Sequence, residues 1–378
     1  MYSRLLAPPK QKSFFLFGPR GTGKTHWVKE KFPNALYLDL LNTSLYADLL
    51  ARPHRLEEFI LRDFDDWIVI DEVQKIPELL NEVHRLIEGR GLRFVLTGSS
   101  ARTLRRKGVN LLAGRALTYS MHPLTLVEMA GSYDRAKMLK YGLLPAVQSE
   151  DDPAKYLEAY VATYLREEVL QEGLIRNLGA FARFLETASF SQGGVLNISE
   201  IARECSSGRK TVDGYFEILE DLLLSVRLPA FNKRAKRRVV SHPKFYYFDL
   251  GVYRTLRPRG PLDSEEELMG ATFETLFFQN LRALNDYGNC EYEIYYWRTA
   301  TQLEVDFVLY GPRGLLAFEI KSGSTIHPSD LHGLLAFKEE YPMVRPFIIY
   351  NGDRELNQNG IRILPMEKAL LQLPELLK

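Results

Sequence analysis

Hydrophobic and polar positions alternate along the first third of the chain in blocks that predict strands and helices in turn. The mainly apolar segments, each of the length of a buried strand, span residues 14–17, 35–40, 67–70 and 93–96, with Asp39 and Arg93 as their charged members. The segments that predict helices span residues 25–32, 42–61 and 77–88. This alternation predicts a parallel α/β sheet whose ligand lies at the carboxyl ends of the strands.

The first apolar run leads directly into a glycine-rich turn. Its residues fit G-x-x-x-x-G-K-[ST], the pattern of a phosphate-binding loop, and they are Gly18, Pro19, Arg20, Gly21, Thr22, Gly23, Lys24 and Thr25. Backbone N–H groups of such a loop wrap phosphates, Lys24 would reach the β- and γ-phosphates, and Thr25 would bind Mg²⁺. A glycine turn without a nucleotide is the alternative, and the next motif argues against it.

The apolar run at 67–70 ends in two carboxylates, which is the Walker B pattern. Asp71 would hold Mg²⁺ together with Thr25, and Glu72 would orient or deprotonate the attacking water. Two acids at a solvated strand end or helix cap are the alternative. Because they follow a phosphate-binding loop, the two motifs together predict an NTPase that uses Mg²⁺.

Two hydroxyls and an arginine are further candidates for the same site. Thr97 and Ser99 follow the run at 93–96, where a hydroxyl can face the γ-phosphate or the attacking water; capping of the next helix is the alternative. Arg115 could stabilise transition-state charge on the nucleotide of a neighbouring subunit, or it could be a surface arginine. An arginine acting in trans requires a head-to-tail ring, for which a hexamer is the default expectation.

Composition narrows the class of protein. The 378 residues suggest two or three domains, and 46% hydrophobic residues suffice for ordinary cores. A formal net charge of +1 means that any nucleic-acid surface must be a local patch. Cys205 and Cys290 lie far apart, and no apolar run approaches the roughly 20 residues of a membrane span. These features predict a cytoplasmic protein without a disulfide framework, a structural zinc site or a membrane partner.

Beyond the predicted NTPase core, the pattern becomes helical. Residues 153–173 carry apolar and aromatic side chains at helical spacing and predict a long amphipathic helix. A short helix at 196–204, entered by a serine cap, is followed by a glycine turn and a helix at 211–224. Strands at 225–231 and 245–248 would then form a two-stranded wing. This order predicts a winged helix-turn-helix.

The strongest local charge bias of the chain lies between the two predicted wing strands. Residues 232–238 carry five Lys or Arg side chains and no acid. Together with a basic pair at the second helix, the candidate DNA contacts are Arg209, Lys210, Lys233, Arg234, Lys236, Arg237 and Arg238. Contacts to phosphates position a protein on duplex DNA without reading its sequence. A solvated hairpin tip or a surface for an acidic protein is the alternative.

The last hundred residues carry a second group of candidate catalytic residues. The predicted elements are a helix at 270–284, strands at 292–297, 303–309 and 315–321, a helix at 328–340 and a strand at 344–350. Asp306 and the Glu319-x-Lys321 pair match the arrangement D-x(n)-[DE]-x-K. Glu319 and Lys321 would point to one face of their strand. The carboxylates could hold Mg²⁺ against a scissile phosphate, Lys321 could activate water, and Glu274 could complete the metal shell.

These motifs together resemble a large bacterial and archaeal family of AAA+-type ATPases. The resemblance covers essentially the whole chain and rests on GPRGTGKT, WIVIDE followed by VQKIPEL, FVLTGSS, LLAGR and HPLTLVE. It implies ATP as the nucleotide and a sensor role for the hydroxyls after the 93–96 strand. The C-terminal pattern is similar to the restriction-endonuclease-like PD-(D/E)xK fold, although Val305 stands where proline is usual. Residues 141–145 (YGLLP) are similar to an element of signal-transducing relatives, expected in a small helical region.

We therefore expect a multidomain α/β protein. The expected domains are a P-loop AAA+ core at residues 1–130, a helical lid or linker at 131–175, a winged helix at 176–255 and a restriction-endonuclease-like α/β domain at 265–378. The leading hypothesis is an ATP-hydrolysing protein that acts on duplex or branched DNA, such as a four-way junction. Two alternatives remain open: a nucleotide-dependent regulatory or defence switch with protein partners and an inert nuclease-like domain, and an ATP-dependent endonuclease.

Overall fold

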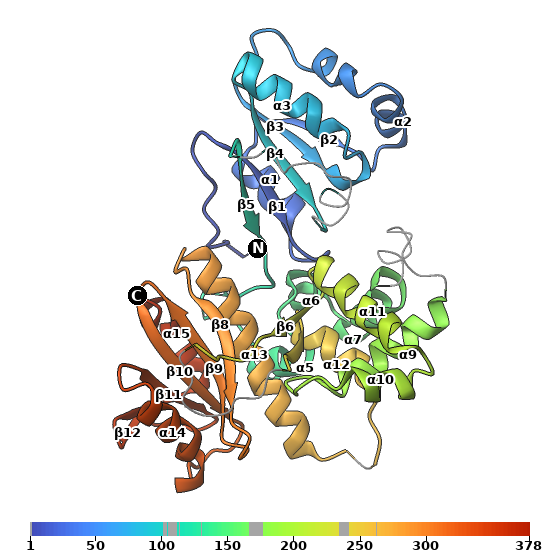
Figure 1. Cartoon of the computed structure of the whole chain (residues 1–378). Helices are drawn as coiled ribbons and strands as arrows, with labels where there is room; N and C mark the ends of the chain where they lie inside the picture. The colour runs from blue at the N-terminus through green and yellow to red at the C-terminus, as the bar shows by residue number, and fades with distance from the viewer. Residues whose placement is uncertain are drawn as a thin grey trace. The chain divides into compact units, whose positions relative to one another are not determined.

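The chain forms two compact units (Figure 1). The computed structural model describes residues 2–100, 104, 112, 114–129, 131–165, 177–233, 242–261 and 263–378. The parallel-sheet unit comprises residues Arg4–His122 and Asp221–Leu223. The mixed-sheet unit comprises residues Met1–Ser3, Pro123–Glu220 and Leu224–Lys378.

The parallel-sheet unit is built on a five-stranded sheet in the order β2-β3-β4-β1-β5. Its strands are β1 (Ser13–Phe17), β2 (Leu36–Asp39), β3 (Trp67–Asp71), β4 (Arg93–Gly98) and β5 (Ala116–Ser120). All four neighbouring pairs are parallel. Every residue of β1 and β3 is buried, as expected for strands covered on both faces. The predicted parallel α/β core is confirmed.

One predicted helix of this unit, at residues 42–61, is wrong. The helices are α1 (Lys24–Lys31), α2 (Thr43–Ala51) and α3 (Leu79–Arg90), with 3₁₀ turns η1 (Pro53–Phe59) and η2 (Val73–Lys75). Helix α2 ends because Pro53 disfavours a helical backbone at Arg52, where φ is −144°. Leucines on both pieces still pack in one core, so the apolar pattern continued past the break.

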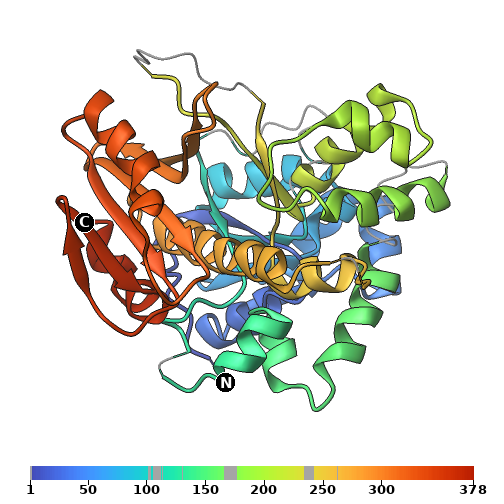
Figure 2. The same ribbon diagram turned by 90° about the horizontal axis from the view of Figure 1, so that it is seen from below.

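The mixed-sheet unit contains a six-stranded sheet in the order β12-β13-β11-β10-β9-β8. Its strands are β8 (Glu293–Arg298), β9 (Glu304–Gly311), β10 (Gly314–Lys321), β11 (Arg345–Tyr350), β12 (Leu356–Gln358) and β13 (Ile361–Pro365). Strand β11 pairs in parallel with β10 and β13, and the other pairs are antiparallel. The associated helices are α13 (Glu265–Tyr287), η4 (Pro328–Leu331), α14 (His332–Glu340) and α15 (Met366–Leu376). Figure 2 shows the long helix α13 lying along the sheet, and the rings of Phe277 and Phe318 are 5.2 Å apart there.

The rest of this unit is mainly helical. Its helices are α5 (Arg135–Tyr141), α6 (Pro145–Ser149), α7 (Pro153–Ala159), η3 (Tyr160–Leu165), α9 (Leu178–Ser189), α10 (Ile198–Glu204), α11 (Arg209–Asp221) and α12 (Leu250–Leu256). The helix predicted at 153–173 is α-helical to Ala159 and π-helical to Leu165, and its remainder lies outside the described residues. The cap of α10 is Asn197 rather than a serine, since its side chain accepts from the Glu200 N–H.

The YGLLP segment is fixed to the start of α12. Helix α5 ends at Tyr141 and is capped by Gly142, and an added Cβ on Gly251 would overlap the Tyr141 carbonyl oxygen. The buried Asp249 caps α12 and also accepts a hydrogen bond of 2.9 Å from the Leu143 N–H. Only glycine at 251 permits this close approach of two backbones.

A two-stranded antiparallel sheet of β6 (Ser225–Leu228) and β7 (Lys244–Tyr247) stands where the wing was predicted. The predicted first strand is too long, because Pro229 has no N–H to continue the ladder. Instead, the Pro229 carbonyl accepts from Tyr296 N–H at 3.1 Å, and Phe231 N–H donates to the Tyr296 carbonyl at 2.7 Å. The chain after β6 is therefore bonded to β8 of the six-stranded sheet.

Two simpler expectations concern cysteines and membrane spans. Cys205 and Cys290 are both buried and unpaired. Within the described part of the chain, no helix has the length and apolar character needed to cross a bilayer.

Candidate functional site

The glycine-rich loop takes a conformation that its glycines permit. Gly21 and Gly23 have φ angles of +79° and +91°, in the left-handed region that favours glycine. A Cβ on Gly18 would overlap the Met121 carbonyl oxygen. Thr22 Oγ1 donates to the Pro19 carbonyl at 2.8 Å, which tightens the turn.

Lys24 opens helix α1 directly after this loop. Its side chain is buried, and Nζ donates to the Pro19 carbonyl at 3.1 Å, so the ammonium lies over the loop. The first N–H groups of α1 lack partners within the helix and carry the positive end of its dipole. The loop, the helix terminus and Lys24 thus present donors and positive charge to one place, as phosphates require.

Asp71 is the centre of a hydrogen-bonded group at the carboxyl ends of the strands. Thr25 Oγ1 donates to Asp71 Oδ2 at 3.1 Å, Thr97 Oγ1 donates to Oδ1, and the Tyr37 hydroxyl donates to Oδ2. Burial and the Asp71 carboxylate raise the pKa of Tyr37 well above its ordinary value, so Tyr37 stays a neutral donor. The sequence had suggested Thr25, Asp71 and Thr97, but not Tyr37.

The donor set of this group fits Mg²⁺. Thr25 and Asp71 offer a hydroxyl and a carboxylate oxygen, which are the hard ligands that Mg²⁺ prefers. Among the described residues, no group of three or more His, Cys, Asp and Glu side chains is arranged to hold a metal ion. One carboxylate and one hydroxyl suit an ion that completes its shell with water and substrate phosphates.

Glu72 and Ser99 are joined by a residue that the sequence did not indicate. Glu72 has φ +61°, an uncommon conformation for a residue other than glycine. Gln74 Nε2 donates to Glu72 Oε2 and also to Ser99 Oγ, at 3.2 Å in the second case. Gln74 Oε1 is buried and has no hydrogen-bond partner among the described residues. The local sequence offered little signal, because both Gln74 and Lys75 are polar residues between the apolar Val73 and Ile76.

Arg115 lies just before β5 and forms an ion pair with Glu88 near the end of α3. Strand β5 runs parallel to β1, so its amino end lies at the sheet edge opposite to the loop that follows β1. Within one chain, Arg115 is therefore not part of the site at the loop. An action on a neighbour's nucleotide would require release of the Glu88 pair.

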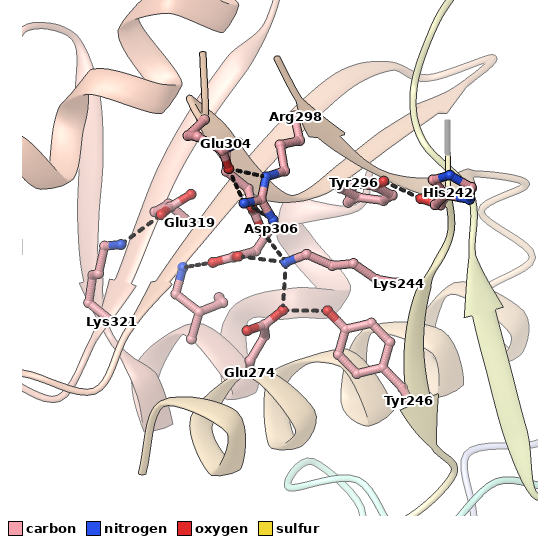
Figure 3. Close-up of polar contacts among 12 residues, drawn as sticks. His242, Lys244, Tyr246, Glu274, Tyr296, Arg298, Glu304, Asp306, Glu319 and Lys321 are labelled. Carbon is pink, nitrogen blue, oxygen red and sulfur yellow. Dashed lines mark hydrogen bonds and ion pairs between the residues drawn. The ribbon is translucent and has the colours of Figure 1, made fainter. Parts of the chain in front are cut away.

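A second group of polar residues lies in the mixed-sheet unit (Figure 3). The β8/β9 register shifts between the pairs Tyr295–Val308 and Trp297–Val305, so Asp306 lies in a β-bulge, a feature that re-aims side chains. Asp306 Oδ2 accepts a hydrogen bond of 2.9 Å from the Ile320 N–H. On β10, Lys321 Nζ donates to Glu319 Oε1 at 2.7 Å, as the i, i+2 spacing predicts.

An unpredicted lysine lies among these acids. Lys244 of β7 is buried, and its Nζ is 3.1 Å from Glu274 Oε1, 3.1 Å from Asp306 Oδ1 and 2.5 Å from Glu304 Oε1. Burial by itself would lower the pKa of Lys244, but the three carboxylates hold it well above its ordinary value. Tyr246, two residues further along β7, donates to Glu274 Oε1. We call the four acids Glu274, Glu304, Asp306 and Glu319 the carboxylate cluster.

The carboxylate cluster does not fit the predicted Mg²⁺ as it stands. The predicted ligands Glu274 and Asp306 both contact the Lys244 ammonium, and Glu319 contacts Lys321. Burial and the nearby Asp306 charge raise the pKa of Glu319, although Lys321 acts in the opposite direction. No local pattern could have indicated Lys244, because it lies 62 residues from Asp306.

The candidate DNA contacts differ in their surroundings. Arg209 and Lys210 are exposed at the start of α11. Lys233 Nζ is 2.5 Å from Glu293 Oε2 and 4.3 Å from the centre of the Tyr310 ring. The remaining candidates, Arg234, Lys236, Arg237 and Arg238, lie outside the described residues.

Comparison with protein families gives three matches in order along the chain. Residues 10–130 match the family described as AAA domain. Residues 133–263 and 269–369 match two families described as domains of unknown function, DUF8612 and DUF4143. The first match, the parallel sheet and the loop together support a P-loop AAA+ ATPase core, with further sheet-containing parts beyond it.

Similar proteins cover most of the chain and are themselves uncharacterized. One from Mycobacterium tuberculosis is 27% identical over 348 residues, which is 89% of this chain and 76% of that protein. One from Haemophilus influenzae is 23% identical over 328 residues, 81% of this chain and 78% of the relative.

Two solved structures show weak similarity. The ORC1 protein of Aeropyrum pernix in complex with DNA has a TM-score of 0.29 at 15% identity, covering 66% of this chain and 87% of its own. A Vibrio cholerae protein has a TM-score of 0.23 at 11% identity, with 97% of both chains covered. Scores this low do not establish a shared fold, so nothing about function follows from them.

Proposed function

We propose that this chain hydrolyses ATP with Mg²⁺ at the loop formed by residues 18–25. The observation that carries the proposal is the 3.1 Å hydrogen bond from Thr25 to Asp71, which brings the two predicted Mg²⁺ ligands together beside that loop. The match to a AAA domain over residues 10–130 supports the same activity.

In the proposed mechanism, each group has one task. The loop N–H groups and Lys24 would hold the phosphates, and Thr25 and Asp71 would hold Mg²⁺, which would supply charge neutralisation at the phosphates. Glu72 orients the attacking water and accepts its proton, and Ser99 lies within reach of the same place through Gln74. Positioning and charge neutralisation, rather than covalent chemistry, supply the rate enhancement.

We further propose that the ATPase acts on DNA, with turnover coupled to remodelling or translocation. Helices α10 and α11 with the β6/β7 pair have the order of a winged helix, and Arg209 and Lys210 are exposed at the start of α11. In this proposal, residues 131–175 serve as a helical lid or linker, 176–255 as the winged helix and 265–378 as a nuclease-like domain. Phosphate contacts by Arg209 and Lys210 would be sequence-independent.

A second candidate is a nucleotide-dependent regulatory switch with a protein partner. It is favoured by the engagement of basic residues inside the mixed-sheet unit, since Lys233 pairs with Glu293 and Lys244 lies in the carboxylate cluster. The hydrogen bonds of residues 229 and 231 to β8 also tie the proposed wing to the neighbouring sheet. The remaining alternative, an ATP-dependent endonuclease, would need a metal ion among the acids of the carboxylate cluster. The Lys244 ammonium occupies that position.

The deciding experiment measures Mg²⁺-dependent ATP hydrolysis without DNA, with linear duplex and with a four-way junction. Lys24→Ala should abolish hydrolysis, whereas Lys31→Ala, an exposed lysine on the same helix, should not. Stimulation by DNA that is lost in Arg209→Ala/Lys210→Ala supports the DNA proposal. A Lys24-dependent rate indifferent to every DNA supports the switch, and hydrolysis that survives Lys24→Ala overturns the ATPase assignment.

A further inference from the structure

We propose that Lys244 takes the place of a divalent cation in the carboxylate cluster, so that this nuclease-like site is closed from within by the chain's own ammonium. Removal of that ammonium would leave a site that binds Mg²⁺ or Mn²⁺. The inference rests on the proposed nuclease-like character of residues 265–378, but not on ATP hydrolysis or DNA binding.

The ammonium is fully coordinated by carboxylates. A lysine side chain has three N–H donors and no acceptor, and Lys244 Nζ has three carboxylate oxygens within 3.1 Å. The oxygens belong to three residues on two elements, Glu274 on α13 and Glu304 and Asp306 on β9. As they stand, these acids are arranged around an ammonium and not around a metal ion, since no group of three acids among the described residues is placed to hold one. A hard divalent cation in place of the ammonium would use the same carboxylate oxygens.

One acid of the cluster, Glu319, lines a cavity and has a carboxylate oxygen that lacks a hydrogen-bond partner among the described residues. A cavity of about 460 Å³ is lined by Glu274, Glu304, Asp306 and Glu319, and Lys244 is not among its lining residues. The Glu319 side chain is 10% exposed, and its Oε2 has no hydrogen-bond partner among the described residues. Burying an unpaired carboxylate oxygen is costly, so the cluster holds an unsatisfied acceptor beside the cavity.

Lys244 is one of only three cations that pair with the four acids of the cluster among the described residues. Arg298 NH1 pairs with Glu304 Oε2 at 3.2 Å, and Lys321 pairs with Glu319. Without Lys244, those two cations would remain for four acids, and Glu274 and Asp306 would lack a cationic partner in the cluster. Buried acids left without a partner are strongly destabilising, so a divalent cation is the natural replacement.

The position of Lys244 is fixed by its strand. Leu228 of β6 pairs with Lys244 across the two-stranded sheet, and Tyr246 anchors the same face of β7 to Glu274 (Figure 3). The bonds of residues 229 and 231 to β8 hold the chain next to this strand. A metal ion from solution would therefore have to displace a buried strand residue, not a water molecule.

The test is a titration of the full-length, nucleotide-free protein with Mn²⁺. The electron paramagnetic resonance signal of free Mn²⁺ measures how much of the ion is bound. Lys244→Met removes the charge and keeps an unbranched side chain, and it should bind about one more Mn²⁺ per chain than the wild type. At Mn²⁺ 100-fold above the dissociation constant, its Tm should rise by about 5 °C. The double variant Lys244→Met/Asp306→Asn should lose the additional site.

Lys233→Met is the matched control, because this lysine also pairs with an acid in the mixed-sheet unit but lies outside the cluster. It should acquire no Mn²⁺ site. The inference is overturned if folded Lys244→Met binds no additional Mn²⁺, or if the wild type already binds Mn²⁺ in a manner that Asp306→Asn abolishes.

Loss of stability in Lys244→Met does not end the test. In that case, Mn²⁺ should restore the wild-type Tm, and failure to restore it also overturns the inference. Hydrolysis of ATP that depends on Lys24 is a separate measurement on the same proteins, so failure of the ATPase proposal and failure of this one are distinguishable.

Discussion

Gln74 shows how much a single side chain contributes to the geometry of the nucleotide site. Its amide N–H₂ group contacts both Glu72 and Ser99, and Glu72 is held in a left-handed backbone conformation that costs on the order of 1–3 kcal/mol. Such strain is retained where the surrounding contacts fix the residue. Gln74 is therefore a positioning residue for the proposed catalytic acid.

We predict that Gln74→Ala lowers the kcat of ATP hydrolysis by about 10- to 100-fold, because a small displacement of the acid that orients water is expensive. Nucleotide affinity should be unchanged, since the hydrogen bonds of the Gln74 side chain go to Glu72 and Ser99 and not to the loop or to Asp71. Steady-state kinetics and nucleotide titration check this split. Lys75→Ala, at the exposed neighbouring position, is the control. A weaker nucleotide affinity with normal kcat would contradict the role.

At Gly251, the prediction concerns stability. Gly251→Ala should lower the free energy of unfolding by about 3 kcal/mol, because its Cβ would overlap the Tyr141 carbonyl and backbone would have to move. Gly214→Ala is the control: a Cβ there meets nothing within 4 Å, and alanine inside helix α11 should stabilise by about 0.5–1 kcal/mol. Thermal unfolding compares the two, and equal shifts in Tm would contradict the steric explanation.

Single residues could be predicted from the sequence where the chemistry is local. Lys24, Thr25 and Asp71 stand in motifs whose spacing carries the meaning, and the structure brings the last two together. Lys244 stands in an ordinary strand pattern. Its partners are distant in sequence, and only the packing of β7 on the six-stranded sheet makes it part of a site.

At the scale of elements, apolar periodicity predicted many of the strands and helices, but not α9, α12, β12, β13 or α15. Two of the predicted elements have wrong ends, and proline explains both. The helix expected at 42–61 breaks at Pro53, and the strand expected at 225–231 ends before Pro229. In both places the apolar pattern continues, because the side chains after the break still enter a core. The apolar pattern of the sequence therefore indicates which side chains are buried. Backbone hydrogen bonding determines where a helix or strand ends.

The cap of α12 makes a pH-dependent contribution to stability. Burial raises the pKa of Asp249 to about 6 from 3.8, although three backbone N–H groups act in the opposite direction. Below pH 3.8 the group is protonated in folded and unfolded chains alike. Above pH 6 it is ionised in both, and the folded state bears a cost of up to about 3 kcal/mol. This contribution to stability therefore falls as pH rises from about 4 to 6.

Thermal unfolding of wild type and Asp249→Asn between pH 3.5 and 7 tests this prediction. The variant carries no titrating group at position 249, so the Tm of the wild type relative to the variant should fall from about pH 4, through pH 6, and level off only toward pH 7. Asparagine has one acceptor oxygen fewer than aspartate for these N–H groups. This loss changes the Tm of the variant by the same amount at every pH. A difference that does not change with pH would show that Asp249 keeps an ordinary pKa.

At the scale of the whole molecule, the open question is whether chains cooperate. Arg115 lies outside its own chain's nucleotide site, so a catalytic contribution requires a second chain placed head to tail. We propose such a ring, with a hexamer as the default size. An arginine that acts in trans is worth about 10³- to 10⁵-fold in kcat in other phosphoryl-transfer systems.

Mixing two inactive variants tests the ring. Arg115→Ala and Glu72→Gln should each lose hydrolysis, but an equal mixture should regain about a quarter of wild-type activity, because random assembly restores one interface in four. Glu88→Ala, which releases Arg115 from its ion pair, is the control and should stay active. A mixture no more active than its parts, or a fully active monomer by light scattering, contradicts an arginine in trans.

The buried Lys244 also has a consequence for biosynthesis. The ribosome adds Lys244 to the chain 62 residues before Asp306, so at about 5–20 residues per second the lysine waits about 3 to 12 s for its last acidic partner. During that interval the Lys244 ammonium lacks Asp306, and the Tyr246 ring lacks Phe307, with which it packs in the folded chain. The mixed-sheet unit therefore closes late in translation, and chaperone contact with the nascent chain should concentrate on this segment.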